Sequence, residues 1–167
     1  KLSANLLLHY EKSMKEHDDN DDYFMDKPQV EQFNAQSHWL WNGEHYIMHA
    51  GLGLLKEDRK SGQMDDAPLT TYNFPYEINI ETNRYEGYMK HAFILDHHNG
   101  TNIALLASAS MQEQDAKYGL KEYYVNEKNA YASLVFETTF KHIHSLSAGL
   151  SLNHDYLGQR VRTHVPF

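Results

Sequence analysis

The 167-residue sequence contains no cysteine, which excludes both a disulfide framework and a thiolate metal site. It also lacks a run of the about 18 consecutive apolar residues that a transmembrane helix needs. The longest apolar run is Ile103–Ala107. Basic residues are few, with 15 Lys and Arg against 23 Asp and Glu. The resulting net charge of -8 argues against nucleic acid as the main partner, because phosphate binding needs a basic face.

Signals for secretion and for catalysis are missing as well. The sequence opens with Lys1-Leu2-Ser3 rather than with Met, a charged start and a long apolar stretch. We therefore expect a mature or internal segment. We find no nucleophile elbow, no phosphate-binding glycine loop and no zinc-protease motif, so we do not expect an enzyme.

The dominant pattern that is present is an alternation of apolar and polar residues with period two, as in a half-exposed β-strand. For example, Leu146, Ala148 and Leu150 alternate with small or polar residues. Seven such segments of about ten residues occur, which is the length of a tilted strand that crosses a membrane. They are Leu2–Lys12, Val30–Trp41, His45–Leu54, Arg84–Leu95, Asn102–Gln112, Tyr131–Phe140 and Leu146–Tyr156. The pattern predicts an all-β, antiparallel up-and-down meander that is part of a transmembrane β-barrel, with residues 1–167 as one barrel segment.

The connections between these segments alternate in length. Three are short: Asn42-Gly43, His97–Gly100 and Lys141–Ser145. Three are long and polar: Ser13–Pro28, Glu57–Tyr76 and Asp115–Lys128. Bacterial outer-membrane barrels have short periplasmic turns and long extracellular loops, and a soluble sandwich has no reason to keep this alternation.

Aromatic residues fall near both ends of the apolar faces, as in the two aromatic girdles of a membrane barrel. One group lies by the short turns and the other at the opposite strand ends: Trp39, Trp41, Tyr46, Phe93 and Phe140, then Tyr10, Phe33, Tyr85 and Tyr156. The alternation also predicts which side chains face lipid and which face inward. Leu105, Leu134, Phe136, Leu150 and Leu152 should face lipid, and Ser110, Glu137 and Ser151 should face inward.

An acidic stretch in the first long connection matches the spacing of a calcium-binding loop. Asp18, Asn20, Asp22, the Phe24 carbonyl and Asp26 occupy its first, third, fifth, seventh and ninth positions. Tyr23 stands where glycine normally allows the turn, and Gln29 stands where a glutamate would close the site. We expect calcium as the cofactor and a weak, irregular site, with a dissociation constant of about 10⁻⁴–10⁻³ M. The alternative is a solvated acidic loop without a metal.

Four stretches carry a resemblance to a known family. The segment Tyr131–Phe140 and the segment His144–Asp155 that follows it resemble barrel strands of TonB-dependent outer-membrane receptors, closest to the cobalamin and siderophore types. The acidic loop that runs into Met25–Pro28 and the strand Asn34–Trp41 are similar to the same family. Calcium in extracellular loops of cobalamin-type receptors supports the same role for Asp18, Asn20, Asp22 and Asp26 here.

The resemblance implies a barrel of 22 strands filled by an N-terminal plug domain, which TonB pulls. No plug is recognisable in these residues, so the chain would supply barrel wall and extracellular loops. The implied function is import of a scarce nutrient, such as cobalamin or a ferric siderophore, across the bacterial outer membrane. TonB and the nutrient would be partners, with a surface lipoprotein as a further one. The alternatives are an outer-membrane enzyme or adhesin barrel, and a soluble calcium-binding β-sandwich.

Overall fold

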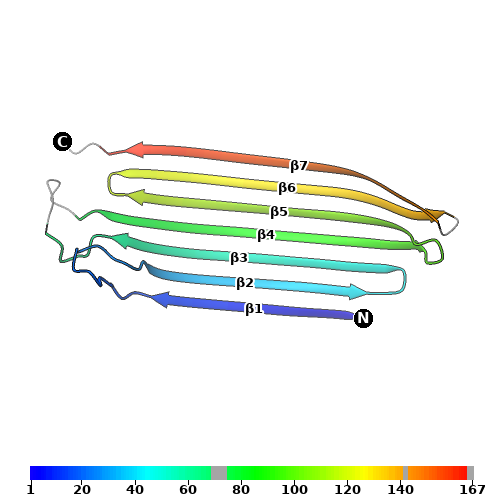
Figure 1. Cartoon of the computed structure of the whole chain (residues 1–167), viewed down its shortest axis with the longest axis horizontal. Helices are drawn as coiled ribbons and strands as arrows, with labels where there is room; N and C mark the ends of the chain where they lie inside the picture. Colours follow the sequence, from blue (N-terminus) through cyan, green and yellow to red (C-terminus); the bar gives the residue numbers. More distant parts are fainter. Residues whose placement is uncertain (69–74, 141–142, 165–167) are drawn as a thin grey trace.

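The computed structural model describes residues 1–68, 75–140 and 143–164, and it contains seven β-strands (Figure 1). Their bounds are β1 Leu2–Ser13, β2 Gln29–Asn42, β3 Tyr46–Gly62, β4 Glu77–Asp96, β5 Thr101–Tyr118, β6 Lys121–Phe140 and β7 His144–Thr163. All pair with their neighbours in sequence order and antiparallel, which confirms the predicted up-and-down meander.

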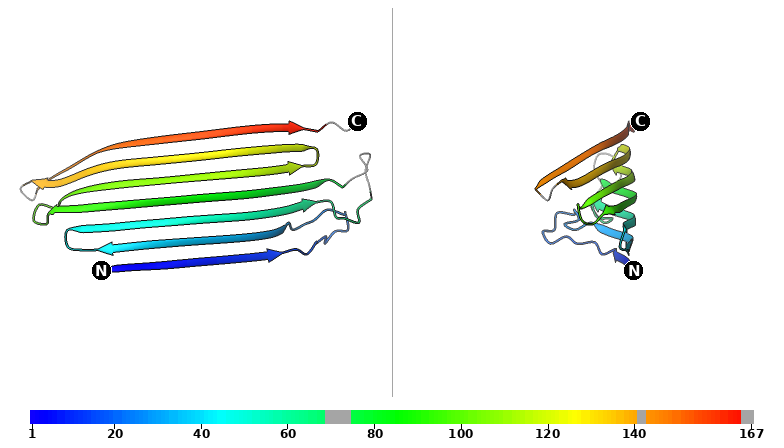
Figure 2. Two further views of the ribbon diagram at one scale, coloured as in Figure 1. Left: turned by 180° about the vertical axis from the view of Figure 1, so that it is seen from behind. Right: turned by 90° about the vertical axis from the view of Figure 1, so that its right-hand side faces the viewer.

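The strands form a single layer, as the end-on view in Figure 2 shows. Strands β1 and β7 are the two edges of this sheet, so the described residues do not close into a barrel. The described ranges contain no helix that is long and apolar enough to span a membrane. No second sheet covers the first within these residues, and Leu150 and Leu152 are 78% and 71% exposed. Within the described residues, the apolar side chains are therefore not packed in the core of a two-layer sandwich.

Six of the seven predicted segments lie inside observed strands, the seventh begins one residue before β3 at His45, and the strands are longer than predicted. They comprise 12 to 20 residues instead of about ten. The prediction of a long connection over Asp115–Lys128 is wrong. These residues belong to β5 and β6, which are joined by the tight turn Gly119-Leu120. The other two connections begin later than predicted, because Ser13 belongs to β1 and residues 57–62 belong to β3, and residues 69–74 of the second lie outside the described residues. Both connections lie at the same end of the sheet as this turn (Figure 1).

The turn between β5 and β6 has a clear physical basis. Gly119 adopts a φ of 56°, in the left-handed region that glycine enters without the steric penalty of a Cβ atom. Its N–H donates to the Glu77 carbonyl at 2.8 Å, which ties the turn to the start of β4. Asp115, Lys117 and Glu122 near this turn are strand residues on one face of the sheet, which is why a count of polar residues suggests a loop.

Candidate functional site

The register places a series of apolar residues from every one of the seven strands on one face of the sheet, here called face A. Residues that pair directly across an antiparallel sheet share a face. One row across the sheet is therefore Leu2, Trp41, Met48, His91, Leu105, Leu134 and Leu150. The prediction that Leu105, Leu134, Phe136, Leu150 and Leu152 share one face is confirmed, as is the grouping of Ser110, Glu137 and Ser151 on the other.

The apolar residues of face A form a band of limited height. On β1 the band runs from Leu2 to Tyr10, which is nine residues or about 30 Å along the strand. At the ~40° tilt of barrel strands, this length corresponds to a height of about 23 Å, close to the ~25 Å apolar band of outer-membrane barrels. Beyond Tyr10, face A becomes charged, beginning with the ion pair between Lys12 and Glu31 at 2.9 Å.

The band crosses the rows of paired residues obliquely. Tyr10 marks one limit of the band on β1, and direct pairing from Tyr10 leads across the sheet to Asn126 of β6. On β6, however, the band ends at Ala130, which is four residues from Asn126. From Trp41, direct pairing leads to Leu134, whereas the other limit of the band on β6 is Phe140. Both limits shift in the same direction. A band parallel to a membrane plane shifts in this way when the strands are tilted, as they are in a barrel.

Three polar side chains inside the band have hydrogen-bond partners within the protein. The Ser37 hydroxyl donates to the Asn5 carbonyl at 3.2 Å, and the Tyr46 hydroxyl pairs with His91 Nδ1 at 2.5 Å. Thr138 is paired with the Thr101 hydroxyl at 2.7 Å. A polar side chain in a hydrocarbon environment needs a hydrogen-bond partner within the protein, because lipid tails offer none.

The opposite face, face B, is polar at the level of this band. The His38 ring bonds the Tyr88 hydroxyl at 3.1 Å, and Arg84 pairs with Glu86 at 2.8 Å. Ser133 and Ser151 share a hydrogen bond at 2.8 Å. Face B also carries a hollow of about 310 Å³, lined by the side chains of His38, Glu86, Tyr88, Ser108, Ser110 and Asn129. Glycines in β3 give these side chains room, because a Cβ on Gly51 would lie 2.4 Å from the Tyr88 ring.

Beyond the band, toward the long connections, the two faces exchange character. Face A carries charged residues and face B carries apolar and aromatic ones. The charged set includes Lys60, Glu81, Asp115, Lys117, Glu122, Arg160 and Arg162, and the apolar set includes Ile78, Ile80, Ala116, Tyr118, Tyr123, Val125 and Val161. Strand β6 extends from Lys128 to Lys121 in this region, which is eight residues or about 26 Å. The sheet therefore continues well past the apolar band.

On face B this end of the sheet holds a hollow of about 570 Å³, lined by Tyr76, Gln114, Ala116, Tyr118, Lys121, Tyr123 and Val125. We call it the tyrosine hollow. The rings of Tyr118 and Tyr123 meet edge to face, with centroids 5.6 Å apart. Tyr76 and Tyr123 are 44% and 36% exposed, so their rings are open to a ligand.

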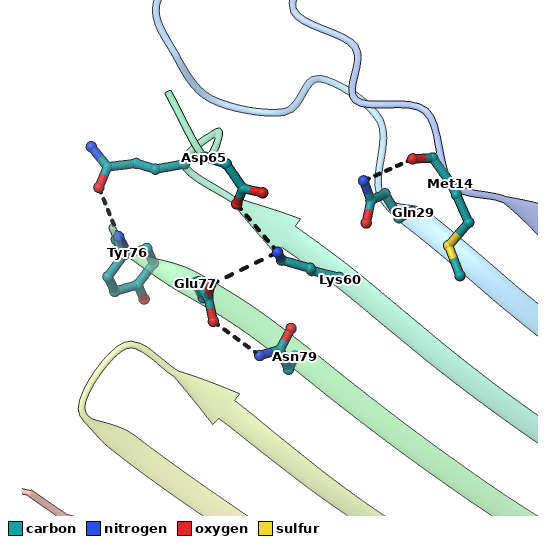
Figure 3. A network of polar contacts seen from close by, with 8 residues as sticks. Met14, Gln29, Lys60, Asp65, Tyr76, Glu77 and Asn79 are labelled. Carbon is teal, nitrogen blue, oxygen red and sulfur yellow. Dashed lines mark hydrogen bonds and ion pairs between the residues drawn. The ribbon is translucent and has the colours of Figure 1, made fainter. Parts of the chain in front are cut away.

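Hydrogen bonds fix the position of Tyr76 at the start of β4. The Tyr76 N–H donates to Gln63 Oε1 at 2.7 Å, and the Tyr76 carbonyl accepts the Gln63 N–H at 2.8 Å. Gln63 itself is buried. Nearby, Lys60 lies 3.4 Å from Asp65 and 3.8 Å from Glu77, a network that ties the end of β3 to β4 (Figure 3). The backbone that carries Tyr76 is therefore held from both sides.

The acidic connection between β1 and β2 forms a closed loop. Asp18 accepts backbone N–H groups from Tyr23 at 2.8 Å and from Asn20 at 3.2 Å. Further along, Asp22 accepts the Phe24 N–H at 2.9 Å, and Asp26 accepts the Asp19 N–H at 2.6 Å. These bonds bring the five predicted ligand residues into one turn of chain. Within the described residues, no group of three or more His, Cys, Asp or Glu side chains is arranged to hold a metal ion.

The loop backbone takes a left-handed conformation at Tyr23, where a calcium loop normally has glycine. Its φ is 65°, and Asp21 has a φ of 59°, so both occupy the left-handed region that is strained for residues with a Cβ atom. Tyr23 therefore adopts the conformation that glycine would take in a calcium loop, although this conformation costs more for tyrosine. The hydrogen bonds to Asp18 hold this strained backbone in place.

Calcium binding by this loop stays a prediction, and a titration can test it. We expect millimolar calcium to slow proteolytic cleavage within residues 14–28, because a divalent ion offsets the repulsion between Asp18, Asp22 and Asp26. The Asp18→Asn and Asp22→Asn variants should lose this protection, and Asp58→Asn, on β3, serves as the control. Equal cleavage with and without calcium would leave a solvated acidic loop.

The pH dependence of this loop follows from Asp18. Partial burial raises the pKa of the carboxyl, but the N–H donors of Tyr23, Asn20 and Asp22 outweigh it and hold the pKa below its ordinary value. The ionised carboxylate thus favours the folded loop at pH above the ordinary Asp pKa. This contribution disappears as the pH falls through the lowered pKa.

No protein-family model, no curated protein and no solved structure matches the chain. The geometry of the sheet and the sequence pattern are therefore the basis for the function. Sequence reasoning missed the tyrosine hollow because it treated residues 115–128 as a loop. The missed signal was the alternation of Tyr123 and Val125 with polar residues, together with Gly119 as a turn residue.

Proposed function

We propose that the chain forms part of the wall of a transmembrane β-barrel in the bacterial outer membrane. The observation that carries this proposal is the apolar band on face A, of membrane height, which continues across seven antiparallel strands and ends at charged residues. Face A contacts lipid in this arrangement, and face B lines a wet interior. The edges of β1 and β7 pair with further strands of the barrel, since bare edges cannot be satisfied in lipid.

Within this class, we propose a TonB-dependent receptor that imports a scarce nutrient such as cobalamin or a ferric siderophore. The sequence resemblance of Tyr131–Phe140 and Asn34–Trp41 to such receptors supports it. The extension of the sheet past the band supports it too, because a tall wall outside the membrane offers room for ligand recognition. The receptor performs no chemistry on its ligand. TonB acts through the plug domain that the resemblance implies, and a surface lipoprotein is a further expected partner.

The soluble sandwich is disfavoured, because the described residues form one layer with an exposed apolar face. An enzyme or adhesin barrel would share the fold. It would differ in function, because neither catalysis nor adhesion depends on energy from TonB.

Uptake measurements test the proposed function. A Gram-negative strain without the gene should lose accumulation of labelled cobalamin or of a labelled ferric chelate, and the restored gene should recover it. Uptake should stop when a protonophore collapses the proton-motive force or when TonB is deleted, because the energy for import comes from TonB. Uptake that persists under both treatments, or that does not depend on the gene, would contradict the proposal.

A further inference from the structure

Two histidines lie close together at the end of the sheet that carries the short turns. His45 belongs to the turn between β2 and β3, and His97 belongs to the turn between β4 and β5. These two turns are at the same end of the sheet (Figure 1), and the pairing of β3 with β4 makes them neighbours. The centroids of the two imidazole rings are 5.1 Å apart, with an angle of 51° between the ring planes.

Hydrogen bonds hold the backbone of both turns in place. The His45 carbonyl accepts the Ile94 N–H at 2.9 Å, which links the first turn to the end of β4. The Asp96 carboxylate accepts the His98 N–H at 2.8 Å and the Asn99 side-chain amide at 2.7 Å, which closes the second turn. The two rings are therefore carried by a backbone whose geometry the sheet determines.

Both imidazoles are available to a ligand. His45 and His97 are exposed, and in the part of the chain that the structure describes neither ring has a hydrogen bond or an ion pair. A neutral imidazole has one nitrogen that can donate a lone pair. The pair can therefore supply two nitrogen donors to one ligand between the turns.

The spacing of the rings fits two imidazoles that share one metal ion. With Zn–N bonds of ~2.0–2.1 Å and a tetrahedral angle, the centres of two ligating rings lie about 5 Å apart. Imidazole nitrogen suits Zn²⁺, Cu²⁺ and Ni²⁺, whereas Ca²⁺ and Mg²⁺ prefer oxygen ligands. No third His, Cys, Asp or Glu side chain among the described residues joins this pair. Water would complete the coordination, so the site is weaker than a structural zinc site with four protein ligands.

We propose that His45 and His97 together bind one divalent transition-metal ion, which bridges the two turns. The two ligands meet only in the folded sheet, so the ion stabilises the paired hairpins relative to the unfolded chain. The pair is defined by the sheet and does not depend on the transport function. In the proposed barrel the short turns face the periplasm, so this site is remote from the extracellular side on which a nutrient arrives.

Equilibrium dialysis of Zn²⁺ against the intact protein, extracted from outer membranes in detergent, tests the proposal. Because the sequence has 12 histidines, the variants are compared with the unsubstituted protein. We expect His45→Gln and His97→Gln each to weaken binding of one Zn²⁺ by about tenfold or more, since loss of a direct ligand costs at least as much as the ~10–100-fold of an outer-shell change. His49→Gln removes another exposed histidine of the same hairpin, on β3, and should leave this binding unchanged.

Two further measurements separate ligation from a structural effect of the substitutions. His97→Cys should retain zinc binding that His97→Gln loses, because a thiolate is also a zinc ligand. With Cu²⁺ bound in place of Zn²⁺, electron paramagnetic resonance should show coupling to one nitrogen fewer in His45→Gln than in the unsubstituted protein. The difference in gel migration between heated and unheated samples verifies that each variant is folded.

The proposal is overturned if the unsubstituted protein does not bind Zn²⁺, or if folded His45→Gln and His97→Gln bind it as tightly as the unsubstituted protein. It is also overturned if His49→Gln has the same effect as the other two variants. Loss of nutrient uptake as a function, with zinc binding intact, would reject the transport proposal and keep this site.

Discussion

Replacement of Leu134 by Arg is expected to block assembly of the protein into the outer membrane. Leu134 lies inside the apolar band of face A, directly paired with Leu105 and Leu150, and its side chain is 50% exposed in the sheet. If face A meets lipid, the guanidinium would be placed in hydrocarbon at a cost of about 2–4 kcal/mol. Very little folded protein should remain in the membrane fraction, as measured by heat-modifiable gel migration and by protease resistance.

Ser147→Arg is the matched control. Ser147 is exposed, lies three residues from Leu150 along β7 within the span of the band, and belongs to face B, where it pairs with Glu137. An arginine there would enter a polar interior beside a carboxylate, so assembly should be close to that of the unsubstituted protein. Equal assembly of both arginine variants would contradict the assignment of face A to lipid.

Replacement of Gly62 by Ala is expected to destabilise the sheet at the end of β3 by about 3 kcal/mol. Gly62 has a φ of 112°, which L-residues avoid, and an added Cβ would lie 2.2 Å from the Tyr76 carbonyl oxygen. Backbone cannot yield as a side chain can, so the β3–β4 pairing would have to shift. The free energy of unfolding from urea titrations of the detergent-refolded protein would show the loss, and the tyrosine hollow should lose Tyr76 from its wall.

Gly100→Ala separates the effect of backbone conformation from that of crowding. Gly100 also has a positive φ of 61°, but its Cβ position has no atom within 4 Å. Only the conformational penalty of about 1 kcal/mol should therefore appear. If both alanine variants were destabilised by the same amount, crowding against Tyr76 would not be the cause.

The strands could be predicted from the sequence because a lipid-facing strand has one apolar face, which imposes a period of two on its residues. Leu146–Tyr156 shows this pattern with one interruption, at His154, and it lies within β7. The short connections Asn42-Gly43 and His97–Gly100 were also recognised, and tight turns at residues 43–45 and 97–100 join the observed strands there.

The outer ends of the strands could not be predicted in the same way. Past the band the alternation continues, but the apolar residues change from face A to face B. In β5, Met111 is apolar on face A, whereas Ala116 and Tyr118 are on face B. When only one apolar face is followed along the sequence, the strand seems to end at this change of face. The charged residues Asp115 and Lys117, which lie on face A beyond it, then suggest a loop. Long-range pairing with β4 and β6 maintains the strand there.

The acidic loop was located from the spacing of its oxygen-bearing side chains, but its backbone could not be foreseen. Local preferences disfavour a positive φ at Tyr23. The three N–H groups that donate to Asp18 compensate for this strain, and they come together only when the loop is closed.

The most direct test of the membrane assignment is cysteine labelling along β6, since residues 1–167 contain no cysteine. Single cysteines are placed at residues 122–136 of the intact protein in cells, and each is treated with a water-soluble maleimide and with a lipid-soluble one. The account predicts that residues 130, 132, 134 and 136 react only with the lipid-soluble reagent. Their face B neighbours 129, 131 and 135 should also react with the water-soluble reagent, because face B lines a wet interior. It further predicts that residues 122, 124 and 126, on the same face beyond the band, react with the water-soluble reagent. Reaction of 132 and 134 with the water-soluble reagent, at the rate found for 124, would contradict a lipid-facing band.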